Sequence, residues 1–279
     1  MTRAGRLLAG PLAVLALAMA GPAGAAVEVT VEGLEGAPLD NVRALLSIEA
    51  AEAEDTAAAP AVRRLHRRAP DEIERALRPY GYYAPTVDGR LERTDDGWRA
   101  SYRVEPGPRV EMTAVRIEFR GDAADDAAFD RLRSELALRA GEPLLHEEYE
   151  AAKQRLLELA ADRGYFDAGW ETHTLRIDPG ALEARAVLVL DSGRRYAFGE
   201  VTFESTALAE SFLRRYVPFE PGEPYLGERL RELRYALDDS DYFRRVDVRA
   251  QRDRRTDGRV PVRVTLATRP QNRYPFGVG

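Results

Sequence analysis

The sequence contains no cysteine, which excludes a disulfide framework and a cysteine nucleophile. Histidine is also scarce: His66, His146 and His173 form no H-x-x-x-H pair or other ligand spacing, and we expect each at the surface or at a helix cap. After the N-terminal segment no apolar run reaches about 20 residues, so no transmembrane helix is predicted there. We therefore expect no catalytic residue, cofactor or metal site, and predict that the chain is not an enzyme.

Neither sign of charge dominates, since the net charge is −6 and no overall basic field favours nucleic acid. Acidic pairs such as Asp125 and Asp126 fall at expected turns or helix ends, where Asp is favoured by local hydrogen bonding. The stretch "DRRTDG" at 253–258 lacks the ligand pattern of a calcium loop. The basic run "RRLHRR" at 63–68 predicts a solvated helix face, with contact to an acidic partner or lipid headgroups as the alternative.

The first 26 residues differ from everything that follows. Arg3 and Arg6 precede an apolar stretch at 7–20, and small residues including Ala23 and Ala25 come next. A basic start, an apolar centre and a small-residue end are typical of a secretory signal peptide. We therefore expect the chain to be exported, with a mature start near residue 26 or 27.

Three copies of one unit follow the signal peptide. Each copy begins with alternating apolar residues, which predict a strand with one buried face: "VEVTVEG" from residue 27, "VRIEFRG" from 115 and "EVTFES" from 200. Two stretches with apolar residues at helical spacing come next. In the second copy these residues are Phe129, Leu132 and Leu136, then Tyr149, Ala152, Leu156 and Leu159; the third copy repeats the latter stripe with Leu226, Leu230, Leu233 and Leu237.

The first copy has the same two helical stretches with a weaker pattern. Val42, Leu45 and Leu46 mark the first helix, and apolar residues within 73–77 mark the second. Pro70 lies in the second stretch, where its missing N–H and its ring are expected to kink or restart the helix.

Each copy ends in two alternating runs separated by a turn sequence. The turns are expected at Asp96-Gly97, Pro179-Gly180 and Asp257-Gly258, because glycine adopts the positive φ that a tight hairpin needs. The unit is therefore β-α-α-β-β, and the fold class is α+β: three tandem domains, each a three-stranded mixed sheet covered by two helices. The expected divisions are 1–26 (signal peptide), 27–107, 108–193 and 194–270 (domains 1, 2 and 3) and 271–279 (start of a barrel segment or linker).

Certain positions recur in the copies and are interpreted as structural. Aromatic pairs fall where the second helix meets a strand, and their rings are expected to fill the space between helices and sheet. Gly-Glu-Pro segments precede the second helix, with glycine ending the first helix or its loop and proline setting up the next helix start. The recurring residues are Tyr82, Tyr83, Gly141, Pro143, Tyr165, Phe166, Gly222, Pro224, Tyr242 and Phe243.

The expected topology leaves sheet edges free. A parallel crossover from the first to the third strand, with a hairpin of the second and third, places the third strand at the centre. An open edge accepts a strand from another chain, so we hypothesise β-augmentation by an extended client at 86–91, 172–177 and 246–251. The candidate residues are Thr86, Val87, Leu91, Thr172, Thr174, Arg176, Val246, Val248 and Arg249. Charged edge residues equally suit protection against aggregation, and this alternative remains open.

The recurring phrases resemble a known domain family. They are "RALRPYGYYAP", "AGEPLLHEEYEAAKQRLLELAADRGYFDA" and "PGEPYLGERLRELRYALDDSDYFRRVDV", in the same place in each copy. An exported tandem of β-α-α-β-β units with these phrases resembles the polypeptide-transport-associated (POTRA) domain. Three units in this order are similar to the TamA family within the Omp85 superfamily, and the resemblance covers essentially the whole mature chain.

The resemblance implies a location at the periplasmic face of the bacterial outer membrane and a role in the insertion or secretion of autotransporter and β-barrel proteins. The implied partners are nascent outer-membrane and autotransporter proteins, a TamB-like inner-membrane protein, and the outer membrane through a C-terminal barrel beyond the residues of this chain. No nucleic-acid partner is expected. Near the C-terminus, Tyr274, Phe276 and Val278 alternate with Pro and Gly, a pattern compatible with the start of a first barrel strand.

Other functions fit the same repeats. Within the superfamily, a two-partner-secretion transporter or a central barrel-assembly subunit is the alternative. Outside it, a free periplasmic scaffold or binding module without a barrel has the same sequence features, and a hydrolase is a remote third interpretation. Client identity and the repeat that contacts a partner are not readable from the sequence.

Overall fold

The computed structural model describes residues 26–51, 59–95, 97–204 and 208–269. Nearly all of the predicted signal peptide, Asp96 of the first predicted turn and the predicted barrel segment lie outside these residues. Among the described residues, no helix has both the length and the apolar composition needed to cross a membrane.

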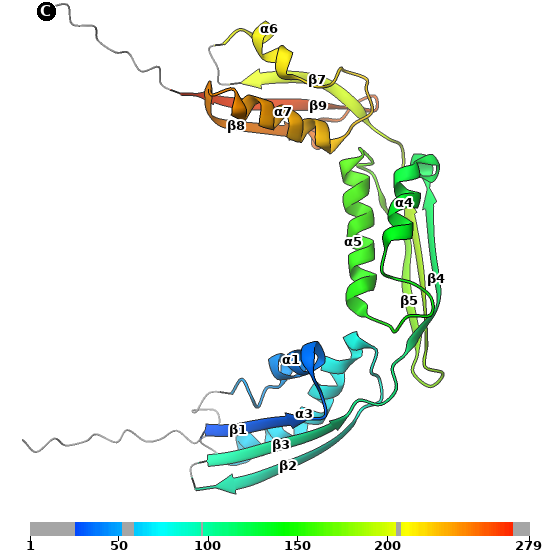
Figure 1. Cartoon of the computed structure of the whole chain (residues 1–279), viewed down its shortest axis with the longest axis vertical. Helices are drawn as coiled ribbons and strands as arrows, with labels where there is room; N and C mark the ends of the chain where they lie inside the picture. The colour runs from blue at the N-terminus through cyan, green and yellow to red at the C-terminus, as the bar shows by residue number, and fades with distance from the viewer. Residues whose placement is uncertain (1–25, 52–58, 96, 205–207, 270–279) are drawn as a thin grey trace, which may run out of the picture. The chain divides into compact units, whose positions relative to one another are not determined.

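Three mixed sheets of three strands each confirm the predicted fold class (Figure 1). Their strand orders are β1-β3-β2, β4-β6-β5 and β7-β9-β8. In each sheet the third strand is central, pairs in parallel with the first and pairs antiparallel with the second, as expected. The strands are β1 Ala26–Glu32, β2 Thr86–Thr94, β3 Gly97–Glu105, β4 Glu111–Arg120, β5 Gly169–Asp178, β6 Glu183–Asp191, β7 Ala197–Glu204, β8 Phe243–Ala250 and β9 Arg259–Thr268.

Helices follow the first strand of every sheet. In the second copy α4 and α5 cover the same face of the sheet (Figure 1). The α-helices are α1 Gly36–Leu45, α3 Ala59–Leu77, α4 Ala127–Glu135, α5 His146–Asp162, α6 Glu210–Leu213 and α7 Gly227–Asp239; the 3-10 turns are η1 Arg78–Tyr80, η2 Gly121–Asp125, η3 Arg214–Tyr216 and η4 Arg252–Arg254.

The chain forms two compact units. The first comprises Met1–Leu77 and Pro85–Pro106, and the second comprises Arg78–Ala84 and Gly107–Gly279. The short segment Arg78–Ala84, which follows α3 in sequence, therefore belongs to the same compact unit as the second and third copies.

In the first unit, the structure differs from the expectations for Leu45 and for Pro70. Val42 and Leu46 are fully buried, but Leu45 is 51% exposed because α1 ends there and the extended backbone of Leu46 turns the next side chain inward. The helix does not restart at Pro70, since α3 runs continuously through it. Ala69 and Ile73 are fully buried on either side of Pro70, so tertiary packing outweighs the loss of one helical hydrogen bond.

The second and third copies each have one aliphatic and aromatic core between helices and sheet. Most residues predicted on the apolar helical faces lie in these cores, with Leu132, Leu159, Leu226 and Leu230 only partly buried. The predicted hairpin at Asp257 and Gly258 has positive φ at both residues (51° and 74°). At the β5–β6 turn the left-handed residue is instead Leu182 (φ 57°), while the Asp178 carboxylate accepts hydrogen bonds from the amides of Gly180 and Ala181.

The Gly-Glu-Pro segments have a different role from the one expected. The helices α5 and α7 begin three residues after the prolines, and neither proline starts a helix. Gly141 N–H donates to Met112 O (2.7 Å) and Met112 N–H donates to Glu142 O (2.9 Å), so the segment pairs with the beginning of β4. Gly222 and Glu223 pair with Phe198 of β7 in the same way. Gly141 and Gly222 have φ of 87° and 98°, which explains the glycine.

A buried carboxylate in the first unit yields a test of its stability. Glu72 is 3% exposed, and its side chain accepts hydrogen bonds from Ser47 N–H (2.9 Å) and Ser47 Oγ–H (2.8 Å). We expect Glu72→Ala to lower the free energy of unfolding by about 1–3 kcal/mol, because the Ser47 amide loses its partner. Chemical denaturation measures this loss, and Asp71→Ala, exposed on the same helix, is the control. Equal midpoints for the two variants would contradict the assignment.

Candidate binding site

The candidate site is built on the outer strands of the sheets. All nine predicted edge residues lie in β2, β5 and β8, and in the described part of the chain no further strand pairs with the outer edges of these strands. Thr174, Arg176 and Arg249 are exposed, whereas Leu91, Val246 and Val248 are partly buried, as alternation requires. The third predicted edge is one residue too long: Gln251 follows β8, and its amide donates to Pro261 O.

The three edges differ in how closely a helix approaches them. The helix α7 packs along β8 and α3 packs along β2, but α5 has hardly any close backbone approach to β5. A groove of about 450 Å³ lies between α5 and β5. Its lining residues are Glu150, Lys153, Gln154, Leu157, Glu158 and Ala161 of α5 and Trp170 of β5.

Trp170 reaches this groove because of a β-bulge. Trp170 pairs with Leu190 and Thr172 pairs with Val189, so Glu171 is an extra residue in β5. The bulge resets the alternation and brings Trp170 to the helix-covered face, where Leu175 and Ile177 also pack. Its indole Nε1–H is buried and has no hydrogen-bond partner among the described residues. An unsatisfied buried donor of this kind costs free energy in the folded state.

The polar residues at the rim satisfy one another. Lys153 Nζ pairs with Glu150 Oε2 at 2.8 Å, and Gln154 Nε2 donates to Glu158 Oε1 at 2.7 Å. The apolar part of the groove is left to Leu157, Ala161 and Trp170. The site is therefore suited to an apolar side chain that lies next to an open backbone edge.

Two of the histidines lie deeper than expected. His66 Nδ1 is 3.0 Å from Tyr102 Oη, and His146 Nε2 is 2.7 Å from Tyr83 Oη. Burial lowers the pKa of both imidazoles. The third, His173, is exposed on β5. No three His, Cys, Asp or Glu residues in the described segments are grouped as metal ligands.

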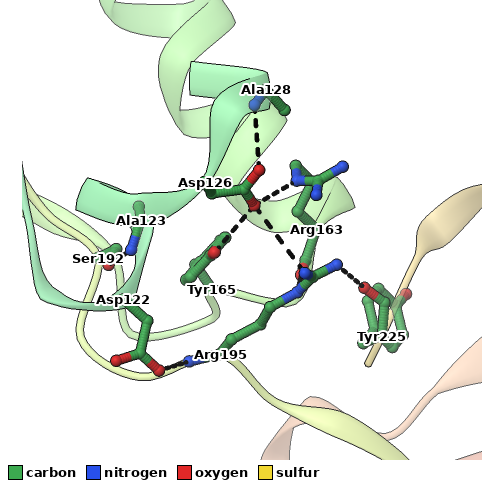
Figure 2. Close-up of polar contacts among 9 residues, drawn as sticks. All are labelled: Asp122, Ala123, Asp126, Ala128, Arg163, Tyr165, Ser192, Arg195 and Tyr225. Carbon is green, nitrogen blue, oxygen red and sulfur yellow. Dashed lines mark hydrogen bonds and ion pairs between the residues drawn. The ribbon is translucent and has the colours of Figure 1, made fainter. Parts of the chain in front are cut away.

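A polar network beside the site was not predicted from the sequence, although Asp126 was expected at a turn or helix end (Figure 2). Asp126 caps α4 by accepting from Ala128 N–H (3.1 Å), and it also accepts from Arg163 Nε (2.6 Å) and Tyr165 Oη (2.9 Å). Burial alone would raise the pKa of this carboxyl, but these hydrogen bonds and the Arg163 charge lower it. Burial and the bond to Asp126 raise the pKa of Tyr165 to about 12.

Arg195 joins this network to the third copy (Figure 2). Its Nε donates to Arg163 O (2.9 Å), its backbone N–H donates to Asp122 Oδ2 (2.9 Å) and its Nη2 donates to Tyr225 O (3.3 Å). Nearby, Asp167 accepts from Tyr196 Oη (2.7 Å) and pairs with Arg255 (2.6 Å). The second and third copies are therefore held together by ionic and backbone contacts. In the sequence, the segments "EPGPRV" at 105–110 and "DSGRRY" at 191–196 join one copy to the next and are alike, and this likeness is the signal that could have pointed to Arg195.

The repeated aromatic pairs have unequal environments. Tyr165 and Phe243 are buried in their cores, and Tyr83 and Phe166 pack at the core margins. Tyr242, by contrast, is 51% exposed, so the expectation of core packing is wrong at this position.

Family models match nearly all of the described chain. The model "POTRA domain TamA domain 1" matches residues 28–106, and the POTRA model described as "Surface antigen variable number repeat" matches residues 115–185 and 196–268. The chain belongs to the POTRA domain family. Its first domain is of the TamA type, as the recurring phrases indicated.

Solved structures of POTRA domains resemble the chain in fold. The Haemophilus influenzae BamA POTRA3-5 structure shares 18% identity (86% of this chain, 95% of that chain, TM-score 0.47), and POTRA1-3 of Anabaena Omp85 shares 17% (88% and 95%, TM-score 0.32). CdiB from Escherichia coli shares 17% over 76% of this chain, which spans 35% of that protein, with a TM-score of 0.31. At these identities and TM-scores the likeness carries no argument, and the assignment rests on the family models.

The Asp126 network predicts a pH dependence of stability. A lowered pKa in the folded state contributes stability that is complete above the unfolded-state pKa of about 3.9 and is lost as the pH falls through the folded-state pKa. We expect Asp126→Asn to lower the free energy of unfolding at pH 7 by about 2 kcal/mol, because Arg163 loses a charged partner.

Thermal melts of both proteins between pH 7 and pH 3 measure this effect. The gap between them should be constant above about pH 5 and should narrow below it. Asp130→Asn, which affects an exposed pair with Arg133, is the control and should change little. A gap that stays constant down to pH 3 would show that the Asp126 charge does not contribute.

Proposed function

We propose that the chain is the periplasmic region of an Omp85-superfamily outer-membrane assembly or secretion factor, and that it binds client or partner polypeptides by strand addition. The observation that carries the proposal is the open β5 edge beside the α5–β5 groove. An edge strand offers backbone donors and acceptors to any extended chain, which suits clients that share little sequence.

Binding at β5 combines two kinds of contact. The client backbone pairs with β5, and one apolar client side chain enters the groove against Leu157, Ala161 and Trp170. Only one position of the client then needs a particular kind of side chain, an apolar one, and the rest of the affinity comes from hydrogen bonds between the two backbones.

The match of the first domain to the TamA domain model supports a more specific proposal about clients, partner and export. On this proposal the clients are autotransporters and other β-barrel proteins, the inner-membrane partner is TamB-like, and residues 1–26 export the chain to the periplasm. The match to the TamA domain model supports TamA over a two-partner-secretion or central barrel-assembly protein.

Photo-crosslinking tests strand addition. A photo-reactive residue at Thr174, exposed on β5, should crosslink to an unfolded outer-membrane protein, whereas the same residue at Arg185, exposed on the central strand β6, should not. Thr172→Pro should reduce the Thr174 crosslink strongly, because proline removes a backbone donor and resists strand pairing. A normal circular dichroism spectrum would show that the Thr172→Pro protein is folded. If its Thr174 crosslink were then unchanged, strand addition at β5 would be excluded.

The groove gives an independent prediction. Leu157→Glu places a charge among apolar groups and should weaken client binding roughly 10-fold or more, the loss expected when an apolar contact of about 1.5–3 kcal/mol is removed. Titration of an unfolded outer-membrane-protein peptide, followed by Trp170 fluorescence, measures the dissociation constant. Leu182→Glu, at the exposed β5–β6 turn, is the matched control and should bind normally. Equal affinities for the two variants would exclude the groove as the side-chain site.

A further inference from the structure

The third sheet has an open face, and many of the charges on that face are paired. The residues of β8 and β9 that pack against the core alternate with residues on the opposite, open face. On the open face Arg249 pairs with Asp247 (2.9 Å), and Arg263 pairs with Glu204 (3.3 Å). These four charges therefore balance one another.

A β-bulge brings two arginines together at one end of this sheet. The register shifts between Phe243 and Arg245, so Arg244 is an extra residue in β8. Both arginines are exposed, and together with Ala267 of β9 they line a cleft of about 220 Å³. Within the described part of the chain, neither guanidinium has an ion pair or a hydrogen bond. This end of the sheet therefore carries two positive charges that no acidic side chain balances.

The corresponding bulge of the second copy carries the opposite charge. Glu171 is the extra residue of β5, and its carboxylate pairs with Arg120 at 2.5 Å. A bulge at this place in the fold therefore does not require an arginine. Packing within the domain consequently does not explain the two arginines of the third copy.

Two neighbouring guanidiniums without an acid attract an anion. Each guanidinium presents a planar fork of N–H donors, which matches the oxygens of a phosphate group. The third lining residue, Ala267, has a small side chain, which leaves room in the cleft for such a group. The cleft is therefore suited to a phosphate group that contacts both arginines.

Exposed aromatic and cationic groups also lie near the start of β8. Tyr242, the residue before β8, is 51% exposed and contacts the Phe212 ring edge-on (centroids 5.5 Å). The Arg215 guanidinium lies over the same Phe212 ring at 4.7 Å, and Arg215 is exposed. Arginines beside exposed aromatic rings are suited to lipid headgroups, because the cations bind phosphates and the rings lie at headgroup level. A free phosphate ion would have no use for the ring.

We propose that this end of the third copy binds the surface of an anionic phospholipid membrane, with Arg244 and Arg245 on lipid phosphates and Tyr242 at headgroup level. The net charge of the chain is −6, so an anionic surface repels the chain as a whole and binding depends on local positive charge. Such a contact holds the third POTRA domain against the membrane. This inference does not depend on client binding at β5.

Vesicle co-sedimentation of the exported chain, residues 26–279, tests the proposal. The chain should bind vesicles that contain phosphatidylglycerol much more strongly than vesicles of phosphatidylcholine alone. The double variant Arg244→Gln/Arg245→Gln should lower partition onto the anionic vesicles roughly 25-fold, since each arginine at such a surface contributes about fivefold. Equal binding of the unmodified chain to both kinds of vesicle would overturn the proposal.

The double variant Arg63→Gln/Arg64→Gln is the matched control. It removes the same charge from two exposed positions of α3, and it should leave vesicle binding nearly unchanged. An equal loss in the two double variants would overturn the proposal, because binding would then follow total charge. The Thr174 crosslink to a client should persist in Arg244→Gln/Arg245→Gln, so that failure of membrane binding and failure of strand addition are distinguishable.

A third variant separates a membrane from a soluble anion. Tyr242→Ser retains both arginines and should also weaken binding to the anionic vesicles, because the ring no longer lies among the headgroups. Unchanged vesicle binding by Tyr242→Ser would overturn the assignment of this end as a membrane contact. Titration with inorganic phosphate, followed by the Nε–H resonances of Arg244 and Arg245, completes the test. Saturation by phosphate in a chain that does not bind vesicles would assign the cleft to a soluble anion and overturn the proposal.

Discussion

The parallel pairing between the first and third strand of each sheet is the constraint on which the other features depend. It requires a crossover, which the helices supply, and it places the third strand at the centre. The second strand is then at the outer edge in every copy. Beside β5 the helix α5 makes few close backbone approaches to the strand, and among the described residues a groove lined by Trp170 lies between them.

The second and third copies contact each other partly through charged side chains, whereas the core of each copy consists of aliphatic and aromatic side chains. The Asp126 side chain is 8% exposed. Its carboxylate caps α4, pairs with the Arg163 guanidinium and accepts a hydrogen bond from the Tyr165 hydroxyl. Such a group is tolerable in a low-dielectric setting only because nearly all of its hydrogen-bonding capacity is used. Arg195 extends the same network to Tyr225 through a backbone carbonyl, so the contact tolerates changes in the side chain at that position.

Much of the fold was readable from the sequence because it rests on local patterns. Alternating residues predicted the strands, and the Asp257-Gly258 pair predicted its turn with the correct positive φ. Errors arose where a distant contact decided the outcome. The helix does not restart at Pro70, because its neighbours are buried, and the Gly-Glu-Pro segments pair with strands 24–30 residues earlier in the chain. The bulge at Glu171 has no local signal, and without it Trp170 would not be placed beside α5. The Asp126 network joins residues nearly 40 positions apart, so only its helix cap was visible in the sequence.

The pairing of the Gly-Glu-Pro segments with β4 and β7 affects how copies of the molecule meet one another. Each of these first strands begins against its own loop, through the bridges of Glu111 with Pro143 and of Ala197 with Pro224. A neighbouring molecule therefore finds the start of that edge occupied, and proline offers it no backbone donor there. Continued pairing of sheets from successive molecules requires both edges of each sheet to accept a strand. A sheet whose first strand is partly covered by its own loop is poorly suited to such pairing. The same loop that shapes the domain thus leaves less of the first-strand edge available for pairing with another chain.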